Sequence, residues 1–107
     1  MKLEEITLEA VDAAYARNGF KPTACNIKPE NGRCCMLGAL TDGNACSLYN
    51  AADILGITSF EAWAIATGFD AGTMGRPIEY GNRFYQEAYE IGFNIGKTYY
   101  DRVEREL

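Results

Sequence analysis

Apolar residues follow the period of a helix in the first part of the chain. Thr7 stands where a helix N-cap is expected, and Gly19 is a typical helix ending. Between them lie the periodic apolar positions Leu8, Val11, Ala14 and Tyr15. Because about 3.6 residues make one helical turn, this pattern predicts a first helix between Thr7 and Gly19.

The next stretch interrupts this period. Residues 21–32 contain two prolines and the pair Asn31-Gly32, which is typical of a tight turn. We therefore expect a loop here, or at most a short hairpin near residues 24–36. Residues 33–40 are almost free of polar side chains, which predicts a short buried helix and leaves a buried strand as the alternative.

Two capped helices are predicted in the middle of the chain. Ser47 precedes an apolar run that ends at Gly56, and Thr58 with Glu61 three residues later forms the capping-box pattern. The second of these helices then begins immediately after the first. Gly68, which again precedes an apolar residue, is expected to end it.

The longest helix is predicted from Asn82 to about Glu104. Its apolar stripes cover an arc of roughly 200°, so this helix must be covered from more than one side. Small residues four apart let another backbone approach closely, and they stand at Ala88, Gly92 and Gly96. We favour packing within the chain, against residues 38–39 or 62–66, over a homodimer in which two copies of this helix meet.

These patterns place the chain in the all-α class. We expect a single helical domain over residues 1–107, with about five helices and a long C-terminal helix. Apolar residues make up 48% of the chain and charged residues 23%, which is close to the average of globular proteins. A packed core therefore needs neither a disulfide nor a metal ion.

Charge is unevenly distributed along the chain. The net charge is -5, and none of the ten basic residues lies between Cys34 and Gly75. Residues 52–65 have the spacing of a helix-turn-helix unit, but its second helix offers no lysine or arginine to bases or phosphates. DNA binding is therefore disfavoured, and a structural helical corner is the preferred interpretation.

No catalytic constellation is recognisable. The chain has no histidine, the usual base for a cysteine or serine nucleophile. The spacing of Cys25, Cys34, Cys35 and Cys46 does not fit a structural zinc site, so we interpret the cysteines first as buried inert thiols, without deciding whether all four are free. We expect no cofactor. Because the chain has no signal-like N-terminus and no long apolar run, we expect a cytoplasmic protein without membrane association.

Two functions from different classes remain. The preferred one is a non-enzymatic interaction or accessory protein that presents an acidic, aromatic-rich surface to a partner protein. The alternative is a small-ligand binder or unconventional enzyme that uses the glycine-rich stretch from Gly68 to Gly75 as a loop. The candidate residues for these two functions are Trp63, Phe69, Asp70 and Arg76 around that stretch, and Tyr89, Phe93 and Tyr100 on the last helix.

Four segments resemble small uncharacterised bacterial and phage-associated proteins of similar length. The segments are Cys35-Met-Leu-Gly-Ala-Leu40, Ala52-x-x-Leu55-Gly-Ile, Trp63 with Gly68-Phe-Asp70, and Tyr89-Glu-Ile-Gly92. They cover roughly Cys34 to Gly96 and are packing motifs. The resemblance implies one helical domain and assigns no functional residue, and the preferred accessory protein could be a phage-type factor.

Overall fold

Helices account for most of the chain. The structure is a computed structural model that describes residues 1–78 and 85–106. In chain order its elements are the 3-10 turn η1 (Leu3–Glu5), α1 (Leu8–Asn18), β1 (Lys21–Pro22), β2 (Arg33–Cys34), α2 (Met36–Leu40), α3 (Leu48–Leu55), α4 (Ser59–Thr73) and α5 (Gln86–Glu106). The predicted mainly helical fold with a long C-terminal helix is confirmed. The predicted beginning of the last helix at Asn82 lies outside the described residues.

Side-chain caps set the beginnings of α1 and α3, as predicted. The hydroxyl of Thr7 accepts a hydrogen bond from the backbone N–H of Ala10, and the hydroxyl of Ser47 accepts one from Asn50. Both helices end at a glycine with a left-handed backbone, Gly19 and Gly56. Glycine adopts this conformation without steric cost, so these two helix ends were readable from the sequence.

Helix α4 begins as predicted but ends later. Its capping box is formed in both directions: the N–H of Thr58 donates to Glu61 Oε1 at 2.9 Å, and the N–H of Glu61 donates to Thr58 Oγ1 at 3.1 Å. The predicted end at Gly68 is wrong, because the helix continues to Thr73. A glycine inside a helix costs about 1 kcal/mol relative to alanine, and packing against α5 offsets that cost here.

The segment between α1 and α2 differs from the predicted hairpin near residues 24–36. Strands β1 and β2 pair in parallel, with Lys21 opposite Arg33. The antiparallel part is one bridge, in which Glu30 and Arg33 exchange two backbone hydrogen bonds of 2.9 and 3.0 Å around Asn31 and Gly32. Both turn residues have positive φ, as a type I′ turn requires. The Asn31-Gly32 pattern therefore indicated a local turn, whereas strand direction depended on contacts from further away.

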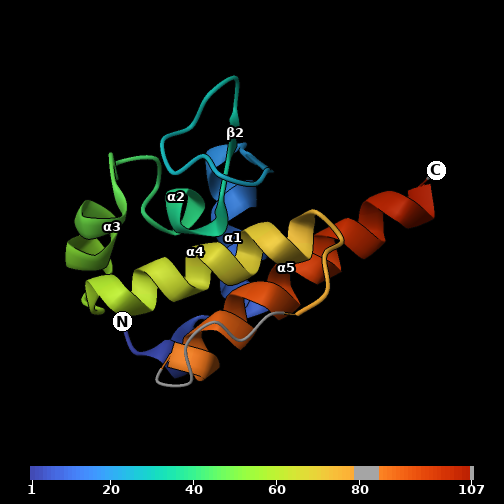
Figure 1. Ribbon diagram of the computed structural model, residues 1–107. Coiled ribbons are helices and arrows are strands. Elements are labelled where there is room, and N and C mark those ends of the chain that lie inside the picture. The colour runs from blue at the N-terminus through green and yellow to red at the C-terminus, as the bar shows by residue number, and fades with distance from the viewer. Residues whose placement is uncertain (79–84, 107) are drawn as a thin grey trace.

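Helices α4 and α5 lie side by side and run in the same direction (Figure 1). A Cβ atom at Gly68 would overlap the carbonyl oxygen of Tyr89, and one at Gly72 would overlap that of Phe93. The reverse holds from α5, where a Cβ at Gly92 or Gly96 would overlap carbonyl oxygens of α4. The two backbones are therefore in direct contact, and the predicted close approach at Gly92 and Gly96 is made within the chain. The α4 residues in this contact lie between Ile65 and Thr73, so they overlap the end of the predicted stretch 62–66 and extend beyond it.

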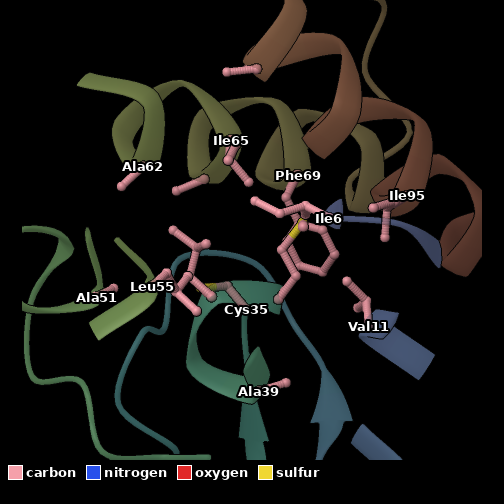
Figure 2. Close-up of a cluster of buried hydrophobic side chains, with 14 of the residues drawn as sticks. Ile6, Val11, Cys35, Ala39, Ala51, Leu55, Ala62, Ile65, Phe69 and Ile95 are labelled. Carbon is pink, nitrogen blue, oxygen red and sulfur yellow. The ribbon is translucent and has the colours of Figure 1, made fainter. Parts of the chain in front are cut away.

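The core lies between this helix pair and the remaining elements. Figure 2 shows side chains such as Val11, Ala39, Leu55 and Phe69 converging from α1, α2, α3 and α4. Every residue from Cys34 to Ala39 is buried, which agrees with the predicted burial of this stretch. The Cα radius of gyration is 12.4 Å, close to the value of about 13 Å expected for a compact domain of this length. None of the described helices combines the length and apolar character needed to cross a membrane.

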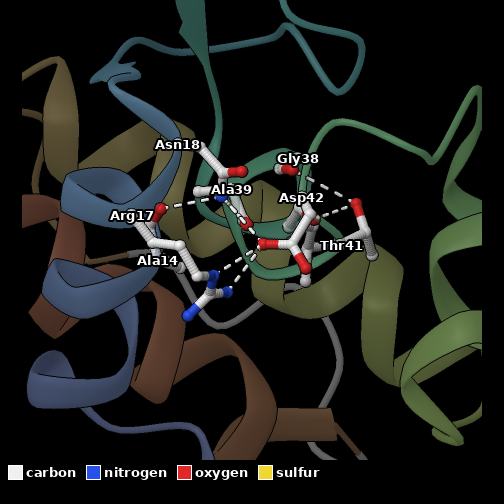
Figure 3. A network of polar contacts seen from close by, with 8 residues as sticks. Ala14, Arg17, Asn18, Gly38, Ala39, Thr41 and Asp42 are labelled. Atoms are coloured by element: carbon white, nitrogen blue, oxygen red, sulfur yellow. Dashed lines mark hydrogen bonds and ion pairs between the residues drawn. The ribbon is translucent and has the colours of Figure 1, made fainter.

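Two polar clusters fasten α1 to its neighbours. In the first, Asp42 accepts hydrogen bonds from Arg17 and Asn18, and these contacts lower the pKa of its carboxyl (Figure 3). In the second cluster, the Asp12 carboxylate accepts a hydrogen bond of 2.6 Å from the Tyr99 hydroxyl and forms an ion pair of 2.9 Å with Arg102. Arg102 lowers the pKa of Asp12, while burial raises that of Tyr99. These charges have partners within the chain, so we interpret both clusters as structural.

Candidate functional site

Three large aromatic side chains are exposed where α3 and α4 begin. The exposed fractions are 73% for Tyr49, 61% for Phe60 and 48% for Trp63. Phe60 and Trp63 are three residues apart on one helix and therefore lie on the same side of it. Together with Leu48, Ser59 and Tyr85, these side chains line a groove of about 460 Å³, which we call the aromatic groove.

The beginnings of three helices hold these side chains in place. Tyr49 lies in the first turn of α3, directly after the cap Ser47, and Phe60 lies in the first turn of α4, after the cap Thr58. Tyr85 directly precedes α5, and its ring stacks on Phe60 at a centroid distance of 5.4 Å. Because α4 and α5 are parallel, their beginnings come together at one end of the molecule. The groove is therefore built on the beginnings of helices, and side-chain caps hold those of α3 and α4.

A second hollow adjoins the aromatic groove. It has a volume of about 390 Å³ and is lined by Leu3, Thr58, Phe60, Glu61, Tyr85, Glu87 and Ala88. Phe60 and Tyr85 line both hollows, so their stacked rings form the wall between them. The carboxylates of Glu61 and Glu87 distinguish the second hollow, which we call the acidic hollow.

The structure separates the residues predicted around Gly68 to Gly75. Trp63 lines the aromatic groove, Phe69 is fully buried in the core, and Asp70 accepts a hydrogen bond of 2.8 Å from the backbone N–H of Cys25. Arg76 is exposed beyond the end of α4. The expectation of a glycine-rich loop is wrong for residues 68–73, since these are helical and packed on α5. Asp70 and Arg76 thus both lie near Cys25, but the four side chains do not converge on one site.

Two of the three aromatic residues predicted on the last helix face the interior. Tyr89 and Phe93 are buried and stack on each other at a centroid distance of 6.2 Å. Tyr100 is at the border of exposure, and its ring lies against Gly75. The apolar face of α5 is thus largely covered by the chain itself. A partner could contact Tyr89 and Phe93 only if the helices rearranged.

Tyr49 and Phe60 were not among the predicted site residues. A signal for Phe60 existed, since Phe60 and Trp63 share one side of a helix whose other residues are mostly small. Exposure was the missing information. A periodic pattern identifies an apolar stripe but does not show whether another element covers it.

Three thiols line a separate cavity of about 420 Å³ near Asp70. They belong to Cys25, Cys35 and Cys46. Partial desolvation and the Asp70 carboxylate raise the pKa of the exposed Cys25, and burial raises the pKa of Cys35 to about 11. Thiols with raised pKa stay protonated at neutral pH and are poor nucleophiles.

Metal binding receives no support at this cavity. Within the part of the chain that the structure describes, no three cysteine, aspartate or glutamate side chains are close enough to hold a metal ion. All four cysteines are free thiols, but only Cys34 and Cys35 are buried, whereas Cys25 and Cys46 are exposed. The interpretation of the cysteines as buried residues is therefore right for two of them and wrong for the other two.

Comparison with protein-family models, curated proteins and solved structures found no match to this chain. The resemblance to small bacterial and phage-associated proteins therefore stays a prediction. Function has to be argued from the two hollows, the exposed aromatic side chains and the charges around them.

Proposed function

We propose that this protein is a non-enzymatic interaction module that binds a partner protein through the aromatic groove. The observation that carries the proposal is the joint exposure of Tyr49, Phe60 and Trp63 around one hollow. Contiguous exposed apolar patches mark interaction sites on soluble domains, and tyrosine and tryptophan are the residues that most often dominate binding energy. An apolar side chain of the partner would enter the groove and remove these rings from water.

The groove is preorganised for such a contact. The first turns of α3 and α4 are held by side-chain caps, and the Phe60–Tyr85 stack joins the beginning of α4 to that of α5. Side chains on rigid elements lose less conformational entropy on binding than side chains on loops. A partner therefore meets a formed surface.

A macromolecular partner suits this surface better than a small ligand. Pockets for small molecules bury about 70–90% of the ligand surface. Here the lining residues Tyr49 and Phe60 are themselves mostly exposed, so the groove is shallow and open. A protein covers the rims of such a groove with residues around the inserted side chain.

Two features disfavour the alternative of an enzyme or small-ligand binder. The stretch that this alternative needs as a loop is helical up to Thr73. The buried thiols are held protonated, with the pKa of Cys34 raised to about 12 by burial and by its neighbour Cys35. Neither feature supplies an activated nucleophile.

The single tryptophan makes the proposal directly testable. Trp63 is the only tryptophan of the chain and it lines the groove, so its fluorescence reports occupancy of this site. A library of random twelve-residue peptides displayed on phage is selected on the purified protein, and enriched peptides are synthesised and titrated. We expect enriched peptides to share an apolar or aromatic anchor and to shift the Trp63 emission.

Variants with smaller groove residues supply the control. Tyr49→Ala and Phe60→Ala retain Trp63 and should weaken peptide binding at least about tenfold, as expected for hot-spot residues. Val103→Ala removes an exposed apolar side chain from α5, outside the groove, and should leave the affinity unchanged. Enriched peptides that bind all three variants as they bind the native protein would overturn the proposal, and so would a library from which nothing is enriched.

A further inference from the structure

Carboxylates stand on both sides of the aromatic groove. Glu61 and Glu87 line the acidic hollow, across the Phe60–Tyr85 stack from the groove. Asp53 is exposed and follows Tyr49 by four residues on α3, which places these two side chains on the same side of that helix. An apolar binding site is thus flanked by negative charge in two directions.

Among the described residues, α3, α4 and the first turn of α5 contain no lysine or arginine that would offset these charges. Residues 34–75, which include all of α3 and α4, contain no basic residue. Two positive charges, the Met1 ammonium and Lys2, lie near Leu3 at the start of the chain, and the two carboxylates of Glu4 and Glu5 beside them balance these charges.

Glu61 and Glu87 lie in the first turns of α4 and α5, where each helix N-terminus contributes about half a positive charge. Two whole negative charges exceed two half charges. The hollow therefore keeps a net negative field even though both carboxylates also stabilise their helices.

We infer that the partner segment carries a lysine or arginine beside its apolar anchor. The anchor occupies the aromatic groove, and the cation lies in the adjoining hollow between Glu61 and Glu87. This inference rests on the proposed function and adds the chemistry of the partner. The capping bond uses Oε1 of Glu61, and a carboxylate has a second oxygen that can accept a hydrogen bond from a cation.

Charge also favours a basic protein segment over a second copy of the chain, a nucleic acid or a lipid surface. A second copy of the chain would bring the same carboxylates to a two-fold contact, and the net charge of each copy is -5. Nucleic-acid phosphates and anionic lipid headgroups are repelled by the same field. A basic segment of another protein combines the apolar and the charged complementarity.

The experiment compares peptides enriched from the same random library on two forms of the protein. One is the native chain, and the other carries Glu61→Gln and Glu87→Gln. Glutamine at the third position of a helix still completes a capping box, so the double variant should fold normally. Glu61→Gln and Glu87→Gln are also made singly, and Glu9→Gln is the matched control for each, because it removes one carboxylate from the first turn of α1, away from both hollows.

We expect peptides enriched on the native chain to carry lysine or arginine within about four residues of the apolar anchor, a distance that spans neighbouring pockets. The double variant should keep the apolar preference and lose the basic one. A basic peptide should bind the double variant roughly three- to tenfold more weakly at low salt, as expected for two exposed ion pairs, and that difference should shrink at high salt. Glu9→Gln should behave as the native chain does.

The outcomes separate this inference from the proposed function. Apolar peptides without basic enrichment would overturn the inference and leave the interaction module standing. No enrichment at all would overturn both. A homodimer in light scattering that dissociates on Phe60→Ala substitution would also overturn both, because the groove would then be occupied by a second copy.

Discussion

The two halves of α4 differ in the exposure of their aromatic side chains. The first half leaves Phe60 and Trp63 exposed, whereas the second half buries Phe69 and presses Gly68 and Gly72 against α5. Full burial of a large apolar side chain contributes about 1.5–3 kcal/mol, and the first half forgoes much of this. The exposed rings therefore contribute little to stability and would gain free energy if the proposed partner covered them, whereas the buried half stabilises the fold.

Glycine gives the second half its particular kind of stability. Without Cβ atoms the two helices approach until backbone meets backbone, which allows Cα–H···O contacts between them. At these glycines the packing leaves no room for an added side chain. Changes in this half should affect folding, and changes in the first half should affect binding.

The largest expected effect is that of Phe69→Ala. Phe69 is fully buried, and its ring lies 6.2 Å from that of Tyr99. Removing a buried phenylalanine side chain leaves a cavity, and the free energy of unfolding should fall by about 4 kcal/mol. Urea unfolding followed by circular dichroism measures this loss. A loss below about 1 kcal/mol would mean that the two halves of α4 are not packed as described.

Gly92→Ala should follow, although it adds only one methyl group. The new Cβ would overlap the backbone carbonyl of Ile65, so the two helices must move apart. Overpacking of this kind costs about 3 kcal/mol. The control is Gly19→Ala, where no atom lies within 4 Å of the added Cβ and only the left-handed backbone is strained, at a cost of about 1 kcal/mol. Equal losses for the two variants would contradict the close helix packing.

Asp12→Asn tests the contact between α1 and α5. It should lower the free energy of unfolding by about 1 kcal/mol at neutral pH, since this cluster is partly exposed. Arg102 holds the pKa of Asp12 below its usual range. The contribution of the Asp12 charge to the free energy of unfolding is therefore complete above the unfolded-state pKa of about 4. It is lost as the pH falls through the lower folded-state pKa.

Unfolding curves of the native chain and Asp12→Asn should accordingly converge at low pH. Asp53→Asn, at an exposed position on α3, controls for the general effect of removing one carboxylate. If the difference in the free energy of unfolding between the native chain and Asp12→Asn persists unchanged below the folded-state pKa, the charge of Asp12 is not what stabilises this contact.

Phe60→Ala should have the smallest effect on stability. The side chain is mostly exposed, and its loss removes the stack with Tyr85, which should lower the free energy of unfolding by about 0.5 kcal/mol. The same variant should weaken peptide binding strongly. Phe69 should thus matter for folding and Phe60 for binding, although both are phenylalanines on the same helix. A large loss of stability in Phe60→Ala would mean that the residues of the aromatic groove stabilise the fold.

Local signals predicted most of the helices correctly. The caps Thr7, Ser47 and Thr58 and the ends at Gly19 and Gly56 depend on hydrogen bonds and backbone angles within a few residues. The end of α4 was missed because the role of Gly68 depends on a distant segment. A glycine that ends one helix and a glycine that admits a neighbouring backbone look identical in sequence.

The environments of the candidate residues could not be predicted. Trp63 lies on the helix predicted for it and is about half exposed, whereas Phe69, which was grouped with it as a candidate, faces the core. Six residues correspond to about 600° of helical rotation, which leaves the two side chains on clearly different sides. Which side is covered depends on where α5 and α2 lie, and no pattern within α4 contains that information.

The sequence by itself determined where α1, α3 and α4 begin, the acidic character of residues 34–75 and the lack of histidine, because these are properties of neighbouring residues or of composition. Only the tertiary structure decided that α4 and α5 run parallel with their backbones in contact, and that Phe60, Trp63, Tyr49 and Tyr85 meet at one exposed end. The physical reason is that burial is a property of pairs of elements. Whether an apolar stripe becomes core or surface is settled when another helix covers it or leaves it exposed to water.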